Sequence, residues 1–140
     1  MSNDVILLVA RILLGVLFIL AGLGKFGDIS GTAGLISSAG LPAGTLLAWL
    51  AAVFEVGAGL AILVGFQTKI VAWLLVAFCL FTGFMFHLGP INIPEFSEGA
   101  NAMLSSFNQV MLMKNVAIAA GFLALVASGP GALSVDARRA

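Results

Sequence analysis

The sequence predicts an all-α integral membrane protein, a four-helix bundle in which each helix crosses the bilayer. Its 140 residues are 61% hydrophobic and only 9% charged, whereas a soluble domain averages about 25% charged residues. A soluble domain this small has a large surface for its volume and needs polar residues to cover it. The apolar residues also form long continuous runs, unlike the alternating pattern of a membrane β-barrel.

Four apolar runs are predicted to be helices, because each is close to the length that crosses roughly 30 Å of hydrocarbon. The first run lacks a basic start and is interrupted by a charge, Arg11, so we expect a retained span rather than a cleaved signal peptide. The four helices form a single domain, 1–140, and cover residues 5–23, 46–66, 70–88 and 110–127.

The connections between the predicted helices differ in length. Only the sequence GFQTK separates the second and third helices, so we expect these two to form a tight antiparallel hairpin. Residues 24–45 form a link rich in Gly and Ser, with a short interfacial helix expected around residues 32–39. Residues 89–108 form the other long link. Both long links are predicted to lie on the same face of the membrane.

Basic residues outside the spans predict the orientation of the chain. Lys69, Arg138 and Arg139 lie on the face that holds the termini and the short loop, whereas only Lys25 lies on the other face. Because basic residues concentrate on the cytoplasmic side, both termini are predicted to be cytoplasmic.

Composition also excludes several kinds of site. The 6 basic and 6 acidic residues cancel, so the chain has no basic surface for nucleic acid. Cys79 is the only cysteine, which excludes a CxxC redox pair and an intramolecular disulfide. One histidine with scattered acids does not make a metal site, so none is predicted.

Charged residues inside the spans are the first candidates for function, because each costs about 2.5–3.5 kcal/mol to insert and is normally paired or functional. Two faces of small and polar residues recur at helical spacing: Arg11, Gly15, Phe18, Gly22 and Lys25 on the first helix, and Ala48, Ala52, Glu55 and Gly59 on the second. These faces predict close packing of the two helices, with an ion pair between Arg11 and Glu55. Such a pair would fix the helix register, and the alternative is a catalytic role.

A second polar group is predicted near the outer ends of the third and fourth spans. His87 ends the third span, and Lys114 and Asn115 lie about one turn inside the fourth, so antiparallel packing would bring them to a similar depth. Lys114 has no obvious acid partner once Glu55 is paired. We expect these residues, together with Lys25, to surround a pocket for a quinone carbonyl or a small anion. The alternative is that Lys114 extends to the headgroups and His87 merely contacts water.

Several motifs resemble those of the DoxX family of small bacterial four-helix membrane proteins. They occur in order along nearly the whole chain: RILLGVLFILAGLGKF, GLP, FEVGAGLAILVGFQTK, FH and KNVAIAAGFLALVASGPGALSVD. The resemblance implies a multi-pass protein of the bacterial cytoplasmic (inner) membrane with both termini inside. The positions that match the family pattern are Arg11, Gly22, Lys25, Glu55, Gly59, His87, Lys114 and Asn115.

The resemblance also implies a link to redox chemistry, because some relatives are membrane subunits of thiosulfate:quinone oxidoreductase. The first hypothesis is therefore a redox-linked membrane subunit that binds a quinone or a small anion and works with a redox partner subunit. The alternative is a non-enzymatic scaffold or transport-related protein whose polar residues only hold the helices together. The sequence leaves open whether the chain is an enzyme, and whether it forms homo-oligomers.

Overall fold

The computed structural model describes residues 2–139, and the regular elements within that range are all helices. Four of them are long and apolar enough to cross a membrane, which confirms the predicted all-α fold with four spans. The helices are α1 (Asn3–Gly27), α2 (Ile29–Ser38), α3 (Gly44–Val64), α4 (Thr68–His87), α5 (Glu98–Ser128) and α6 (Val135–Arg139).

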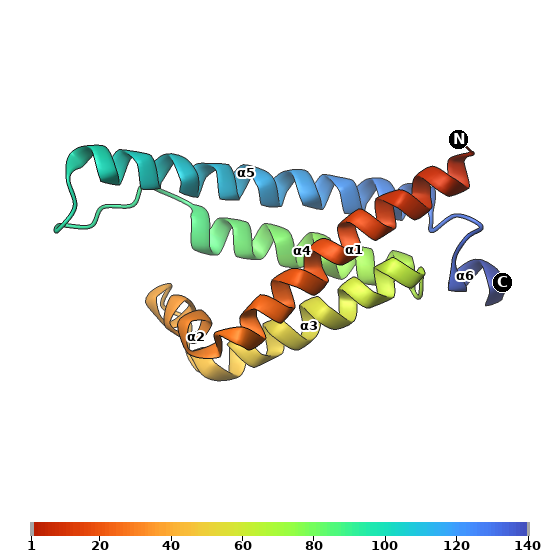
Figure 1. Cartoon of the computed structure of the whole chain (residues 1–140), viewed down its shortest axis with the longest axis horizontal. Helices are drawn as coiled ribbons and strands as arrows, with labels where there is room; N and C mark the ends of the chain where they lie inside the picture. Colours follow the sequence, from red (N-terminus) through yellow and green to blue (C-terminus); the bar gives the residue numbers. More distant parts are fainter. Residues whose placement is uncertain (1, 140) are drawn as a thin grey trace.

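The helices form two antiparallel pairs, α1 with α3 and α4 with α5 (Figure 1). Both termini and the turn between α3 and α4 lie at one end, which we call the termini end. The short helix α2 and the connection between α4 and α5 lie at the other, which we call the α2 end. The two long links therefore lie at the same end, as predicted. The two pairs diverge toward the α2 end, so the expectation of a tight hairpin between α3 and α4 is wrong.

The short helix expected at residues 32–39 is confirmed as α2. It begins after Asp28, whose carboxylate accepts a hydrogen bond of 2.9 Å from the amide of Gly31. This is the ordinary way in which a side chain satisfies one of the free amides at a helix start.

Helix α5 begins at Glu98, about three turns before the predicted start at residue 110. Ser97 starts the helix by accepting a hydrogen bond from the amide of Ala100. Asn101 and Ser105 then project from these first turns and bind the backbone of the α4–α5 connection. These turns are polar, so an apolar run does not reveal them. The 31 residues of α5 extend over roughly 46 Å, well beyond the hydrocarbon thickness.

Helices α1 and α3 approach closely because glycines face each other between them. A Cβ atom added to Gly15 would lie 2.7 Å from the carbonyl oxygen of Gly59, and one added to Gly22 would lie 2.8 Å from that of Ala52. Small residues of this kind permit close backbone contact in membranes. The predicted packing face is confirmed, because the buried residues of α1 are Arg11, Gly15, Phe18 and Gly22.

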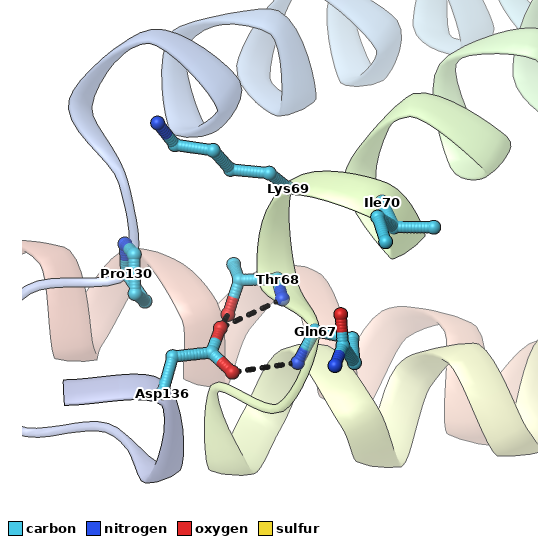
Figure 2. Close-up of a pocket in the computed structure, with 6 residues that line it drawn as sticks. All are labelled: Gln67, Thr68, Lys69, Ile70, Pro130 and Asp136. Carbon is cyan, nitrogen blue, oxygen red and sulfur yellow. Dashed lines mark hydrogen bonds between the residues drawn. The ribbon is translucent and has the colours of Figure 1, made fainter. Parts of the chain in front are cut away.

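The C-terminal segment folds back onto the turn between α3 and α4 (Figure 2). The carboxylate of Asp136 accepts hydrogen bonds of 2.8 Å from the amides of Gln67 and Thr68 and from the Thr68 hydroxyl. The amide of Asp136 in turn donates to the carbonyl of Gly65 at 2.9 Å. A residue distant in sequence thereby satisfies amides at the start of α4 that have no partner within the helix.

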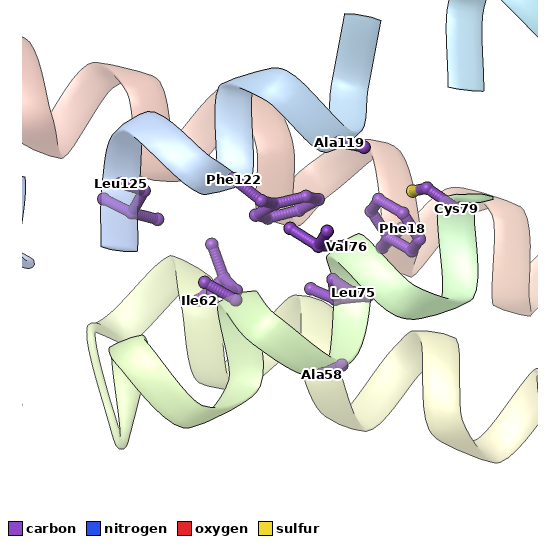
Figure 3. Close-up of a cluster of buried hydrophobic side chains, with 10 residues drawn as sticks. Phe18, Ala58, Ile62, Leu75, Val76, Cys79, Ala119, Phe122 and Leu125 are labelled. Carbon is purple, nitrogen blue, oxygen red and sulfur yellow. The ribbon is translucent and has the colours of Figure 1, made fainter. Parts of the chain in front are cut away.

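Two apolar clusters fill the interior. The smaller one joins α2 to α3 near the α2 end, and Phe86 of α4 packs against it; its buried members are Ala33, Ile36 and Ala48. The larger one joins all four long helices toward the termini end (Figure 3), and its buried members are Phe18, Ala58, Ile62, Ala72, Leu75, Val76, Cys79, Ala119, Phe122 and Leu125. Along α3, Glu55 lies between the two clusters.

Candidate functional site

Glu55 is ion-paired with Lys25 in the layer between the two apolar clusters. The Lys25 ammonium lies 2.8 and 3.0 Å from the two carboxylate oxygens, so both oxygens accept a hydrogen bond. The Glu55 side chain is 5% exposed and that of Lys25 is 28% exposed. The acid is therefore enclosed by protein, while the lysine stem reaches it from the α2 end.

The predicted ion pair between Arg11 and Glu55 is wrong, and the direction of the side chains explains why. Each Cα–Cβ bond in a helix tilts toward the helix N-terminus. In α1 the N-terminus lies at the termini end, so Lys25 leans inward from the α2 end and Arg11 leans away from the middle. Helix α3 runs the opposite way, so Glu55 leans toward Lys25. The helical spacing correctly predicted that all three residues lie on the packing faces of α1 and α3. It did not predict in which direction along the helix each side chain extends.

Arg11 instead lies at the termini end, wholly buried. Its guanidinium donates a hydrogen bond to the carbonyl oxygen of Leu133 in the C-terminal segment. It also lies close enough to Asp136 for electrostatic attraction. The remaining nitrogens, Nε and Nη1, have no hydrogen-bond partner within residues 2–139. Arg11 thus holds the C-terminal segment against α1.

Lys114 is exposed on α5, near the middle of the helix. Its charge acts electrostatically on Glu55 of α3 and on Cys79 of α4, and Cys79 is buried in the larger cluster (Figure 3). Among the described residues the single salt bridge joins Lys25 to Glu55, so no carboxylate is paired with Lys114. Two ammonium groups, those of Lys25 and Lys114, therefore act on the one carboxylate of Glu55.

Asn115 and His87 lie at different depths, so the predicted three-residue cluster with Lys114 is not formed. The Cβ of Asn115 would be 3.0 Å from a Cβ added to Gly83, one turn before His87. The Nδ1 of His87 is 2.8 Å from Oδ1 of Asn108. Asn108 precedes Lys114 by six residues, a distance of roughly 9 Å along the helix. Because α5 is already helical at Asn108, this residue becomes a partner of His87 that the sequence analysis missed.

Asp136 is the acid whose environment at the termini end is most altered. Partial burial raises the pKa of its carboxyl, but the hydrogen bonds from Thr68 and Gln67 and the nearby Arg139 guanidinium outweigh this and hold the pKa below its ordinary value. Near neutral pH the carboxylate is therefore ionised, and it accepts hydrogen bonds from the groups at the start of α4.

The part of the chain that the structure describes contains no group of three His, Cys, Asp or Glu side chains able to hold a metal ion. The polar groups that could contact a ligand supply hydrogen-bond donors: the ammonium groups of Lys114 and Lys25 and the side-chain NH2 of Asn115, whose carbonyl oxygen is in addition an acceptor. Such donors suit carbonyl oxygens and small anions rather than cations.

Comparison with known proteins agrees with this architecture. The DoxX family profile matches residues 6–88, more than half of the chain. Inner membrane protein YqjF of Escherichia coli (strain K12) is 44% identical over 134 residues, which cover 96% of this chain and 92% of that protein. Inner membrane protein YphA of the same organism is 35% identical over 137 residues, which cover 98% and 92%. No solved structure matches the chain. The profile and these nearly full-length relatives show that the chain belongs to the DoxX family.

Proposed function

We propose that the protein is a redox-linked membrane subunit that binds a quinone or a small oxygen-rich anion in the layer containing Lys25, Glu55, Lys114 and Asn115. The supporting observation is the unequal charge of this layer. Lys25 neutralises Glu55 at 2.8 Å, while Lys114, exposed on α5, acts electrostatically on Glu55 and has no carboxylate paired to it among the described residues. A carbonyl or anionic oxygen would supply the missing acceptor.

Ligand binding and electron transfer place different demands on the chain. The donors of Lys114 and Asn115 would orient a ligand oxygen, and the smaller cluster around Ala48 would cover the site from the α2 end. His87, held by Asn108, is a further polar group on that side. Because Cys79 is the only cysteine, no dithiol is available, and a redox partner subunit would supply or remove electrons.

The proposed location is the bacterial inner membrane, with both termini cytoplasmic. The names of the two relatives support the membrane, and the basic residues support the orientation. Lys69, Arg138 and Arg139 lie at the termini end. Lys25 lies nearer the α2 end, and its charge is neutralised by Glu55.

Ligand binding is tested by titrating the detergent-purified protein with a short-chain ubiquinone analogue and, separately, with thiosulfate. Binding followed by calorimetry should be saturable for at least one ligand and lost in Lys114→Met. Lys69→Met, which removes the same charge at the termini end, is the matched control and should bind normally. Absence of binding by the folded wild-type protein to either ligand would contradict the proposal and favour a structural scaffold.

The orientation is tested by cysteine labelling in a Cys79→Ala background. Ser30→Cys in α2 and Ser97→Cys before α5 should react with a membrane-impermeant maleimide added from the periplasmic side. Ala137→Cys in α6 should react only after the cells are opened. The reverse pattern would contradict the proposed orientation.

A further inference from the structure

A cavity of about 230 Å³ lies at the termini end of α4, far from the layer proposed to bind a quinone or anion. It has room for roughly seven molecules of liquid water, which is enough for a phosphate group. Figure 2 shows its walls, which come from the start of α4 and from the C-terminal segment; they are Gln67, Thr68, Lys69, Ile70, Pro130 and Asp136.

The surroundings of the cavity are basic. Lys69 forms part of the wall. The guanidinium carbon of Arg139 lies 5.3 Å from the ring centre of Phe66, the residue before the wall begins. Three of the six basic residues of the chain are thus exposed at this end: Lys69, Arg138 and Arg139.

One acid, Asp136, also lines the cavity, and its charge is largely compensated. Its oxygens already accept three hydrogen bonds from Gln67 and Thr68. Arg11 and Arg139 both attract it electrostatically. Lys69 therefore lacks a carboxylate of its own within the described residues, and the cavity presents a net positive charge.

The cavity lies at the depth of lipid headgroups. The 20 residues of α4 extend over about 30 Å, the thickness of the hydrocarbon. Lys69 is the second of these residues, so its ammonium reaches the level where the hydrocarbon ends. From the cavity an apolar track continues down the same side of α4, because Ile70 is 61% exposed and Trp73 is 55% exposed. An acyl chain beneath a headgroup in the cavity would contact this track.

We propose that the cavity at the start of α4 binds the phosphate headgroup of an anionic phospholipid, with Lys69 and Arg139 contacting the phosphate and Ile70 and Trp73 contacting an acyl chain. Basic pockets at the ends of membrane helices are suited to anionic headgroups. Each basic side chain near such a headgroup gives about a fivefold gain in relative affinity. The inference is independent of the function proposed for the interior layer.

Tryptophan fluorescence tests this directly, because the chain has two Trp residues at opposite ends. Trp73 lies one turn from Lys69, whereas Trp49 lies near the α2 end beside Phe26. The variants Trp49→Phe and Trp73→Phe each leave one reporter. Both are reconstituted in phosphatidylcholine vesicles containing a small fraction of phosphatidylglycerol with brominated acyl chains, which quench nearby indoles. Trp73 should be quenched several-fold more efficiently by brominated phosphatidylglycerol than by brominated phosphatidylcholine. Trp49 should show no such preference.

Single charge removals identify the site in the Trp49→Phe background. Lys69→Gln and Arg139→Gln should each lower the preference for phosphatidylglycerol by about fivefold. Arg138→Gln removes the same charge at the same end, but Arg138 neither lines the cavity nor, unlike Arg139, lies over Phe66 and attracts Asp136. It should leave the preference unchanged. Equal quenching by both lipids, or an equal loss in Arg138→Gln, would overturn the proposal. Relief of quenching by soluble glycerol 3-phosphate would also overturn it, since the site would then bind a free phosphate rather than a lipid.

Discussion

The two ends of the molecule stabilise their charged residues in different ways. In the layer between the apolar clusters, Glu55 is held by another side chain, the ammonium of Lys25. At the termini end, Asp136 is held mainly by backbone amides, and Arg11 by a backbone carbonyl. Asp4 in the first turn of α1 follows the same rule, because it accepts a hydrogen bond of 2.7 Å from a backbone amide of the C-terminal segment.

The difference follows from where free backbone groups occur. Helix ends leave amides and carbonyls without an internal partner, so a charge at the termini end finds a backbone group to bind. Within a helix the backbone groups already bind one another, so Glu55 in the middle of α3 depends on a charged side chain. Lys114 lies well inside α5 and has neither kind of partner among the described residues. Arg11 is bound by the Leu133 carbonyl, whereas within residues 2–139 Lys114 has a free ammonium to which a ligand oxygen could bind.

The largest predicted effect is that of Lys25→Met. It leaves the enclosed Glu55 carboxylate without its ammonium, and losing one member of a buried pair costs about 3–5 kcal/mol of unfolding free energy. Glu55→Gln should cost less, because the free lysine, 28% exposed, can extend to the headgroups. The measurement is unfolding of the purified protein by sodium dodecyl sulfate titrated into mild detergent.

Double variants show whether these residues act as a pair. Lys25→Met combined with Glu55→Gln should be more stable than Lys25→Met alone. Arg11→Met combined with Glu55→Gln should give the simple sum of the two single effects, since these side chains do not touch. Additivity in the first double variant would show that Lys25 and Glu55 do not act as a pair, and coupling in the second would restore the ion pair expected from the sequence.

The sequence predicts the spans well because hydropathy is a local property. It also predicts the α1–α3 interface, since Gly15, Gly22 and Gly59 recur at helical spacing beside polar residues. Choosing between Arg11 and Lys25 as the partner of Glu55 required the antiparallel register and the tilt of side chains toward each N-terminus, and spacing on one helix contains neither.

The candidate site was less predictable for a related reason. The first turns of α5 are polar, so hydropathy gives no signal for them, and they contain Asn108, which is the residue that contacts His87. The contacts of Asp136 with Gln67 and Thr68 join segments 68 and 69 residues apart. No local pattern reveals such contacts.

The second predicted effect concerns the backbone contact that sets the register of the ion pair. Gly59→Ala would place a Cβ atom 2.7 Å from the carbonyl oxygen of Gly15, so the two helices must separate, at a cost of about 1–3 kcal/mol. Gly57→Ala is the matched control, because its added Cβ would meet nothing within 4 Å. It should leave the protein unchanged or slightly more stable. An equal loss of unfolding free energy in both variants would show that the close approach is not needed.

The third prediction removes the carboxylate at the termini end. Asp136→Ala leaves the amides of Gln67 and Thr68 without their acceptor, and loss of a helix cap costs about 0.5–2 kcal/mol. Asp28→Ala is the control and should cost less, because it removes the acceptor of one backbone amide and one exposed hydroxyl at the start of the shorter α2. Both variants are compared with the wild type in the same detergent titration. An effect of Asp136→Ala as large as that of Lys25→Met would remove the contrast between the two ends.

The smallest predicted effect is a pH dependence confined to the termini end. The pKa of Asp136 is lowered in the folded protein, whereas an unfolded aspartate titrates near a pKa of about 3.9. A lowered pKa contributes stability that is fully present above the unfolded value and is lost as the pH falls through the folded value. The difference in unfolding free energy between the wild type and Asp136→Ala should therefore be constant from neutral pH down to about pH 5 and shrink below about pH 4. Other carboxylates titrate in both proteins and cancel in this difference. If the difference instead persisted unchanged in acid, the ionised form of Asp136 would not be what holds the C-terminal segment to the start of α4.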